Sequence, residues 1–348
     1  MKYDQIMQEI TERLTGDWET DINYLRNETE KYKEFPEGLE IIRGIGGLIF
    51  EIMPEDSKNE LEFSIKNDQL HLSNTLLEIQ NKIQNNELDE AEKLVVKILP
   101  DERMFQNDET SVYYTFRNPI EELFYKEKFK PKKSIRIAPF PYNEIYQFYV
   151  YLLVEKSQYE NAFKFIDCAL NRNPLFSEIL FEKAEIYKKQ GNLEEFLATT
   201  IQCLDLIYTS TQMARYFRNL GYYFIEKQKW DAAICSYLMS INWNNDEMAQ
   251  GQLAYISQKT GINIRANDYK NCFEILEKED VQQSPNVLWI DIALAIAESE
   301  NGKEDLDLAQ FCYAIIYDLT GDKEVLETIQ ACEELREQRS KIMCKKGM

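Results

Sequence analysis

Hydrophobic residues recur along the chain with the spacing of amphipathic helices, and between residues 143 and 245 these helices come in pairs. In 143–176, apolar side chains from Tyr146 to Leu153 follow the i, i+3, i+4, i+7 pattern of one helical face. A polar turn follows, and a second apolar stripe then runs to Pro174, which cannot continue a helix. The pattern therefore predicts a helical hairpin, two helices joined by a short turn.

Two further hairpins repeat this arrangement at 177–210 and 214–245. Ala162, Phe196 and Ala233 occupy the same position in the second helix of each unit, and they lie 34 and 37 residues apart. The longer interval indicates a short insertion between the second and third units, which we assign to Thr211-Gln212-Met213.

The three units resemble the tetratricopeptide repeat family, whose period is about 34 residues, in their order of large, small and aromatic positions. The resemblance implies an all-α fold, a right-handed α–α superhelix of stacked hairpins. It also implies a concave face that binds a partner. Binding rather than catalysis is therefore the expected role.

The rest of the chain is also mostly helical by this pattern. We expect an N-terminal helical cap over 1–100 with a degenerate repeat at 72–100, divergent hairpins at 247–283 and 286–320, and a capping helix at 323–346. The solenoid as a whole is thus expected to occupy 143–346.

Residues 101–142 interrupt the period and form an insert rich in aromatic and basic residues. Asn118-Pro119 has the composition of a helix start, and that short helix should end before Pro131. The segment 134–141 alternates and contains prolines, which predicts extended chain. We expect no sheet partner near it.

Composition and charge narrow the possible functions. The formal net charge is −21, which argues against general affinity for nucleic acid or for an anionic membrane. The most apolar stretch, 41–53, is too short to cross a bilayer, and the N-terminus lacks the apolar core of a signal peptide. Seven cysteines without a Cys-x-x-Cys pair indicate reduced thiols, so a cytoplasmic location is expected.

Candidates for chemistry are few. His71 is the only histidine and has no Cys, Asp or His nearby at ligand spacing. The glycines at 44–47 superficially resemble a phosphate loop, but the surrounding pattern is helical, so close helix packing or a kink is the better interpretation. We therefore predict a protein that is not an enzyme and has no cofactor or metal.

The first helix of each hairpin carries a stripe that packing does not use, and in the family this stripe lines the groove. We predict that partner binding involves Tyr151, Phe181, Arg215, Arg218, Asn219 and Tyr222. Aromatic rings and two arginines suit a protein or peptide with acidic and apolar side chains. The positions that match the carboxylate clamp of chaperone-binding members retain one cation, Arg215, so that function is not predicted.

Some alternatives stay open. The stripe residues could simply face water, the chain could be a peptide-sensing regulator, or groove carboxylates such as Glu178 and Glu185 could serve an enzyme. The basic run 126–136 holds six cations and one acid among aromatics. It could pack on its own acidic chain, which we favour, bind a protein partner, or bind single-stranded nucleic acid.

Overall fold

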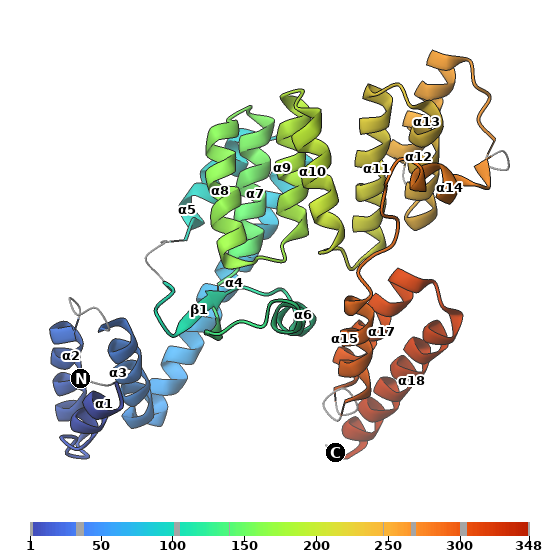
Figure 1. The fold of residues 1–348 in the computed structure, drawn as a ribbon. Coiled ribbons are helices and arrows are strands. Elements are labelled where there is room, and N and C mark those ends of the chain that lie inside the picture. The colour runs from blue at the N-terminus through green and yellow to red at the C-terminus, as the bar shows by residue number, and fades with distance from the viewer. Residues whose placement is uncertain are drawn as a thin grey trace. The chain divides into compact units, whose positions relative to one another are not determined.

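The computed structural model describes residues 3–32, 38–100, 105–138, 140–245, 247–265, 269–299 and 305–346. The described chain is predominantly helical, as the hydrophobic pattern predicts, with one small sheet (Figure 1). It divides into two compact units, 1–78 and 79–348. The second unit carries the site discussed below.

The first unit is built from α1 (Tyr3–Thr11), α2 (Trp18–Tyr32), α3 (Gly38–Ile52) and the beginning of α4 (Glu55–Gln84). Asp17 precedes α2 and caps it, because its Oδ2 accepts a hydrogen bond from the Thr20 amide at 3.1 Å. Gly44 lies inside α3, where an added Cβ would be 2.6 Å from the Tyr3 hydroxyl. The glycine segment is therefore helical, and Gly44 allows close packing, whereas Gly46 and Gly47 have open space where a Cβ would lie.

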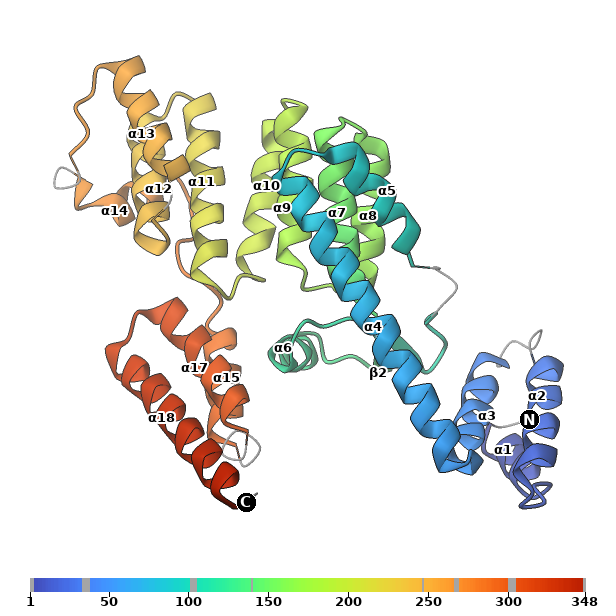
Figure 2. The same ribbon diagram turned by 180° about the vertical axis from the view of Figure 1, so that it is seen from behind.

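The hairpin expected at 72–100 is formed by α4 and α5 (Leu88–Ile98), but α4 is much longer than a repeat helix (Figure 2). Its 30 residues begin at Glu55, well before the expected start. The helix crosses the division between the two units, and α5, which packs against α7 (Tyr142–Glu155), belongs to the second unit.

The three regular hairpins appear where the apolar spacing places them. They are α7 with α8 (Tyr159–Arg172), α9 (Ser177–Lys189) with α10 (Leu193–Leu204), and α11 (Ser210–Glu226) with α12 (Trp230–Trp243). The marker residues Ala162, Phe196 and Ala233 are fully buried in the packing of their hairpins. Successive hairpins contact one another through α7 with α9 and α10 with α11.

Thr211–Met213, assigned as an insertion before the third unit, are helical in the structure. These residues form the first turn of α11, which a capping box begins: the Thr209 hydroxyl accepts from the Gln212 amide, and the Gln212 side chain accepts from the Thr209 amide. Met213 is fully buried. These residues therefore lengthen the helix, because the capping box satisfies amides of its first turn. Buried Met213 adds apolar packing.

The hairpin turns share one backbone geometry. Ser157, Gly191 and Gln228 all have φ between 56° and 72° and lie at the same place in their turns. In each turn the following amide, such as that of Gln158, bonds the carbonyl five residues back. The α4–α5 turn has the same hydrogen-bond pattern around Asn86, so the degenerate hairpin shares the local geometry of the regular ones.

The insert holds β1 (Ser111–Tyr114), α6 (Pro119–Phe129) and β2 (Ser134–Ile137). The Asn118 side chain accepts from the Glu121 amide at 3.0 Å, so the predicted helix start is confirmed. The prediction of extended chain at β2 is also confirmed, but the expectation that it lacks a sheet partner is wrong. It pairs in parallel with β1, which the sequence analysis treated as part of an irregular insert.

The remaining helices follow the predicted bounds closely, except in one hairpin. They are α13 (Glu247–Thr260), α14 (Cys272–Glu277), α15 (Leu288–Glu298), α17 (Leu306–Thr320) and α18 (Lys323–Lys346). The second helix of the 247–283 hairpin is reduced to the six residues of α14. The insert packs against α15: Phe124 of α6 stacks on Trp289 of α15 with ring centroids 3.7 Å apart.

Candidate functional site

A cavity of about 320 Å³ opens between the first helices of consecutive hairpins, and we call it the repeat cavity. Its lining comes from α9, α11, α12 and α13, through Glu185, Lys188, Arg215, Arg218, Asn219, Tyr222, Tyr237, Met248 and Gln252. Residues at i, i+3, i+4 and i+7 of α11 face it together, which is the expected result of helical periodicity. The cavity is therefore a direct product of the repeat.

Four of the predicted partner-binding residues line this cavity: Arg215, Arg218, Asn219 and Tyr222. Phe181 does not, because it is only 1% exposed and lies beneath the Arg215 guanidinium, whose carbon is 4.9 Å from the ring centroid. The prediction that Phe181 contacts a partner is corrected by this burial. Its ring instead supports Arg215 from below.

Tyr151 lies on α7, one hairpin away, and is not among the described lining residues of the repeat cavity. Burial and the nearby carboxylates of Glu155 and Glu182 raise the pKa of its phenol. Because Glu182 also contacts Arg215, Tyr151 is electrostatically linked to the edge of the cavity without forming its wall. Its role in binding stays a prediction.

The cations of the cavity are held by neighbouring acids. Arg215 Nη2 is 2.9 Å from Glu182 Oε1, and Lys188 Nζ is 3.1 Å from Glu185 Oε2. Arg218 also lines the cavity, so three cations and the carboxylate of Glu185 lie in its wall. An acidic side chain entering it would meet cations already positioned.

The aromatic part of the cavity is fixed by packing. Tyr222 meets Phe196 edge to face with centroids 5.5 Å apart, and Lys188 Nζ lies 4.9 Å from the Tyr222 centroid. Burial and the carboxylates of Glu226 and Glu185 raise the pKa of Tyr222, so its hydroxyl stays protonated and can donate a hydrogen bond. Asn219 is oriented by a 3.2 Å hydrogen bond from its Nδ2 to Thr200 Oγ1.

The sequence analysis did not single out Tyr237, Met248 or Gln252 as lining residues. Met248 occupies the second position of the 247–283 hairpin, as Arg215 does in 214–245, so the spacing of the repeat could have found it. Tyr237 lies on a second helix and reaches the cavity because Gly221 leaves room for it. A Cβ at Gly221 would be 2.6 Å from the Tyr237 ring.

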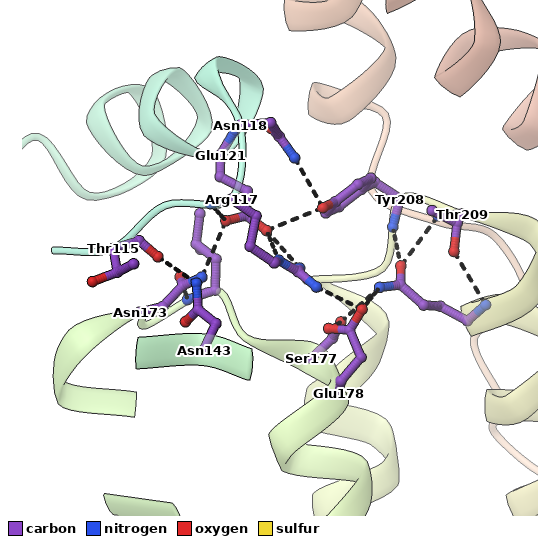
Figure 3. A network of polar contacts seen from close by, with 12 residues as sticks. Thr115, Arg117, Asn118, Glu121, Asn143, Asn173, Ser177, Glu178, Tyr208 and Thr209 are labelled. Carbon is purple, nitrogen blue, oxygen red and sulfur yellow. Dashed lines mark hydrogen bonds and ion pairs between the residues drawn. The ribbon is translucent and has the colours of Figure 1, made fainter. Parts of the chain in front are cut away.

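A second polar cluster, drawn in Figure 3, joins the insert to the hairpins and has a structural role. Its centre is the fully buried Glu121, which accepts from Arg117 Nε at 2.6 Å, from the Tyr208 hydroxyl at 3.1 Å and from Asn173 Nδ2 at 3.1 Å. Arg117 also pairs with Glu178 of α9. The insert is thus fastened to the hairpins by paired charges.

The two carboxylates that an enzyme would need in the groove are used differently. Glu178 belongs to the Figure 3 cluster, where it accepts from Gln212 Nε2 at 2.8 Å, whereas Glu185 lines the repeat cavity. Burial opposes ionisation of Glu178, but Arg117 together with the hydrogen bonds that the carboxylate accepts lowers its pKa below the ordinary value. The two carboxylates of α9 thus take part in different contacts.

The cations of the basic run 126–136 mostly have partners in the same chain, which supports packing of the insert on its own chain. Lys126 pairs with Glu122 at 2.5 Å, and Lys128 pairs with Asp205 at 2.9 Å. Lys133 donates to the Asp108 carbonyl and Arg136 to the Tyr113 hydroxyl. Lys130 and Lys132 are exposed.

Other candidates add no chemistry to the part of the chain that the structure describes. His71 is exposed on α4, and no group of three or more His, Cys, Asp or Glu side chains among the described residues could hold a metal ion. Within the same residues, no helix combines the length and the apolar character needed to cross a membrane.

Comparison with known proteins finds no relative of this chain among protein families or curated proteins, since no family model and no curated protein matches its sequence.

Proposed function

We propose that this chain is a tetratricopeptide-type scaffold whose hairpins stack into a right-handed superhelix and whose repeat cavity binds a peptide segment of a partner protein. We also propose that it acts without catalysis, in the cytoplasm, on the basis of its repeat pattern and cysteine usage. The observation that carries the proposal is the convergence of four predicted residues from the stripe on one cavity.

The chemistry of the cavity suggests what the segment contains. Arg215, Arg218 and Lys188 favour a carboxylate side chain, while Tyr222 and Met248 offer apolar surface beside it. Met248 is 72% exposed, so a partner could cover a side chain that now faces water. We therefore expect a segment with an acidic residue close to an aliphatic or aromatic one.

Selection from a displayed library of random linear peptides tests this proposal. Peptides that bind the purified chain should be rich in Asp or Glu next to apolar residues. The double variant Arg215→Glu with Arg218→Glu should weaken them at least about tenfold, because reversing two charges removes more than 1.4 kcal/mol of binding free energy. Fluorescence anisotropy of the selected peptides would measure the change.

Two further variants separate loss of binding from loss of folding. Met248→Glu places a carboxylate in the cavity at an exposed helical position and should also weaken the peptides. Lys227→Glu reverses a cation at the end of α11, outside the described lining of the cavity, and should leave them bound. The proposal would be wrong if selected peptides bound the wild type and both cavity variants equally well.

A further inference from the structure

A second recess lies between the insert and the C-terminal part of the chain, and we call it the α6–α15 groove. Its volume is about 630 Å³. It is lined by Pro119, Leu123, Lys126 and Glu127 of α6, by Asp291, Ile292, Ala295, Ile296 and Ser299 on and after α15, and by Leu308 of α17. The repeat cavity shares none of these residues.

Regular helical spacing builds both walls of the groove. On α6 the lining includes residues 119, 123 and 127, and along α15 it includes 291, 295 and 299. Each set follows i, i+4, i+8, so one continuous ridge of each helix faces the recess. Two ridges side by side form an elongated site, which suits an extended or helical segment better than a compact small molecule.

The groove is held open by packing beneath it. Phe124, on the buried side of α6, stacks on Trp289 with an interplanar angle of 7°, and the Trp289 indole donates to the Asp205 carbonyl at 3.2 Å. The same Asp205 pairs with Lys128 at 2.9 Å. These contacts fix the two walls relative to each other before any partner binds.

The floor and walls are mainly apolar. Leu123 is 41% exposed, and Ala295 is also exposed, while Ile292 and Ile296 lie at the bottom with less than a tenth of their surface accessible. Covering Leu123 and Ala295 would remove apolar surface from water, which favours binding. Leu123 is not a lone exposed side chain, because it shares one lining with Ala295 and Ile296, and a contiguous apolar surface is a feature of interaction sites.

The rim of the groove is acidic. Lys126 is paired with Glu122 at 2.5 Å, so its charge is already neutralised by a carboxylate outside the lining. Glu127 and Asp291 are exposed carboxylates on opposite walls. The whole chain carries −21, so a second copy would bring like charge to this rim, whereas a basic segment would be attracted.

We propose that the α6–α15 groove binds an apolar peptide segment that carries a Lys or Arg side chain on a partner protein. The apolar residues of the segment lie over Leu123, Ala295 and Ile296, and its cation reaches Glu127 or Asp291. This site would prefer a ligand of the opposite charge to that of the repeat cavity. The proposal does not depend on the function of the repeat cavity.

The test selects a displayed library of random linear peptides on the wild-type chain and sorts the pool on variants of each site. Ala295→Arg fills the groove with a cation at an exposed helical position, and Asp291→Lys reverses one rim charge. Peptides that lose binding to these variants should contain Lys or Arg beside apolar residues. We expect about a tenfold weaker Kd with each variant by fluorescence anisotropy.

Matched controls distinguish binding at the α6–α15 groove from binding at the repeat cavity. Met248→Glu, which alters the repeat cavity, should leave the basic peptides bound, and circular dichroism would verify that each variant folds. Three results would overturn the proposal: no peptide distinguishes wild type from Ala295→Arg, the groove-dependent peptides are acidic, or sedimentation shows a dimer that Ala295→Arg abolishes. The last result would make a second copy the occupant.

Discussion

The repeat cavity and the α6–α15 groove are both lined by residues on helix faces, yet the two linings differ in charge and polarity. The first brings three cations and two tyrosines together in about 320 Å³. The second has about 630 Å³, an apolar floor and two carboxylates at its rim. The two recesses share no lining residue, so substitutions in one leave the wall of the other unchanged.

The difference has a structural origin. In the repeat cavity, consecutive hairpins place equivalent positions of α9, α11 and α13 next to one another, so the repeat itself sets the wall. In the α6–α15 groove, the walls are about 170 residues apart in sequence, and the insert brings them together through Phe124 and Trp289. The first site depends on the period, and the second depends on the docking of the insert.

The largest expected effect comes from breaking that docking. Glu121→Ala removes a fully buried carboxylate that accepts from Arg117, Tyr208 and Asn173, and leaves these donors buried without it. We expect the free energy of unfolding to fall by about 3 kcal/mol, as measured by urea denaturation. Peptides of the α6–α15 groove should be lost, while those of the repeat cavity should still bind.

The matched control is Glu122→Ala, the adjacent carboxylate on the exposed side of α6. It pairs with Lys126 near the surface, so its removal should cost less than about 1 kcal/mol. Equal destabilisation by the two variants would mean that the buried cluster does not fasten the insert.

Four of the six residues predicted from the sequence line the repeat cavity, because helical periodicity brings residues three, four and seven apart onto one face. Arg215, Arg218, Asn219 and Tyr222 follow from helical offsets alone, whereas the burial of Phe181 depends on where Arg215 lies above it. The α6–α15 groove could not be predicted in this way. The insert has no periodic partner, and neither its pairing of β1 with β2 nor its contact with α15 leaves a local pattern.

A smaller loss of stability is expected from Gly221→Ala, which should disturb the repeat cavity and leave the α6–α15 groove intact. In Gly221→Ala the new Cβ would lie 2.6 Å from the ring of Tyr237, which is 2% exposed and cannot move into solvent. We expect a loss of about 2 kcal/mol in thermal or urea unfolding, with weaker binding at the repeat cavity and an unchanged α6–α15 groove.

Gly251→Ala is the control for this change, because Gly251 also lies in a helix but has open space around its Cα. That variant should be stabilised by about 0.5–1 kcal/mol, since alanine restricts the unfolded chain and favours helix. If both variants were stabilised, the packing of Tyr237 against Gly221 would not be tight.

The smallest effect concerns Glu178, which joins the insert to α9 through Arg117. Burial opposes ionisation of its carboxyl, but its pKa is lowered from 4.5 because Arg117 and the hydrogen bonds to the carboxylate together favour the ionised form. A carboxylate with a lowered pKa in the folded state contributes stability that is complete above pH 4.5 and is lost as the pH falls through the folded value. The stability difference between wild type and Glu178→Gln should therefore shrink on acidification.

Urea denaturation at a series of pH values from neutral to about 3 would measure this difference, in a range that covers the titration of the carboxylate. Repeating the comparison in an Arg117→Gln background isolates the cause, because the pKa of Glu178 should no longer be held low there. The same pH dependence in both backgrounds would show that Arg117 is not responsible. A dependence that disappears with Arg117 would instead show that this pair fastens the insert, and with it one wall of the α6–α15 groove, to the hairpins that form the repeat cavity.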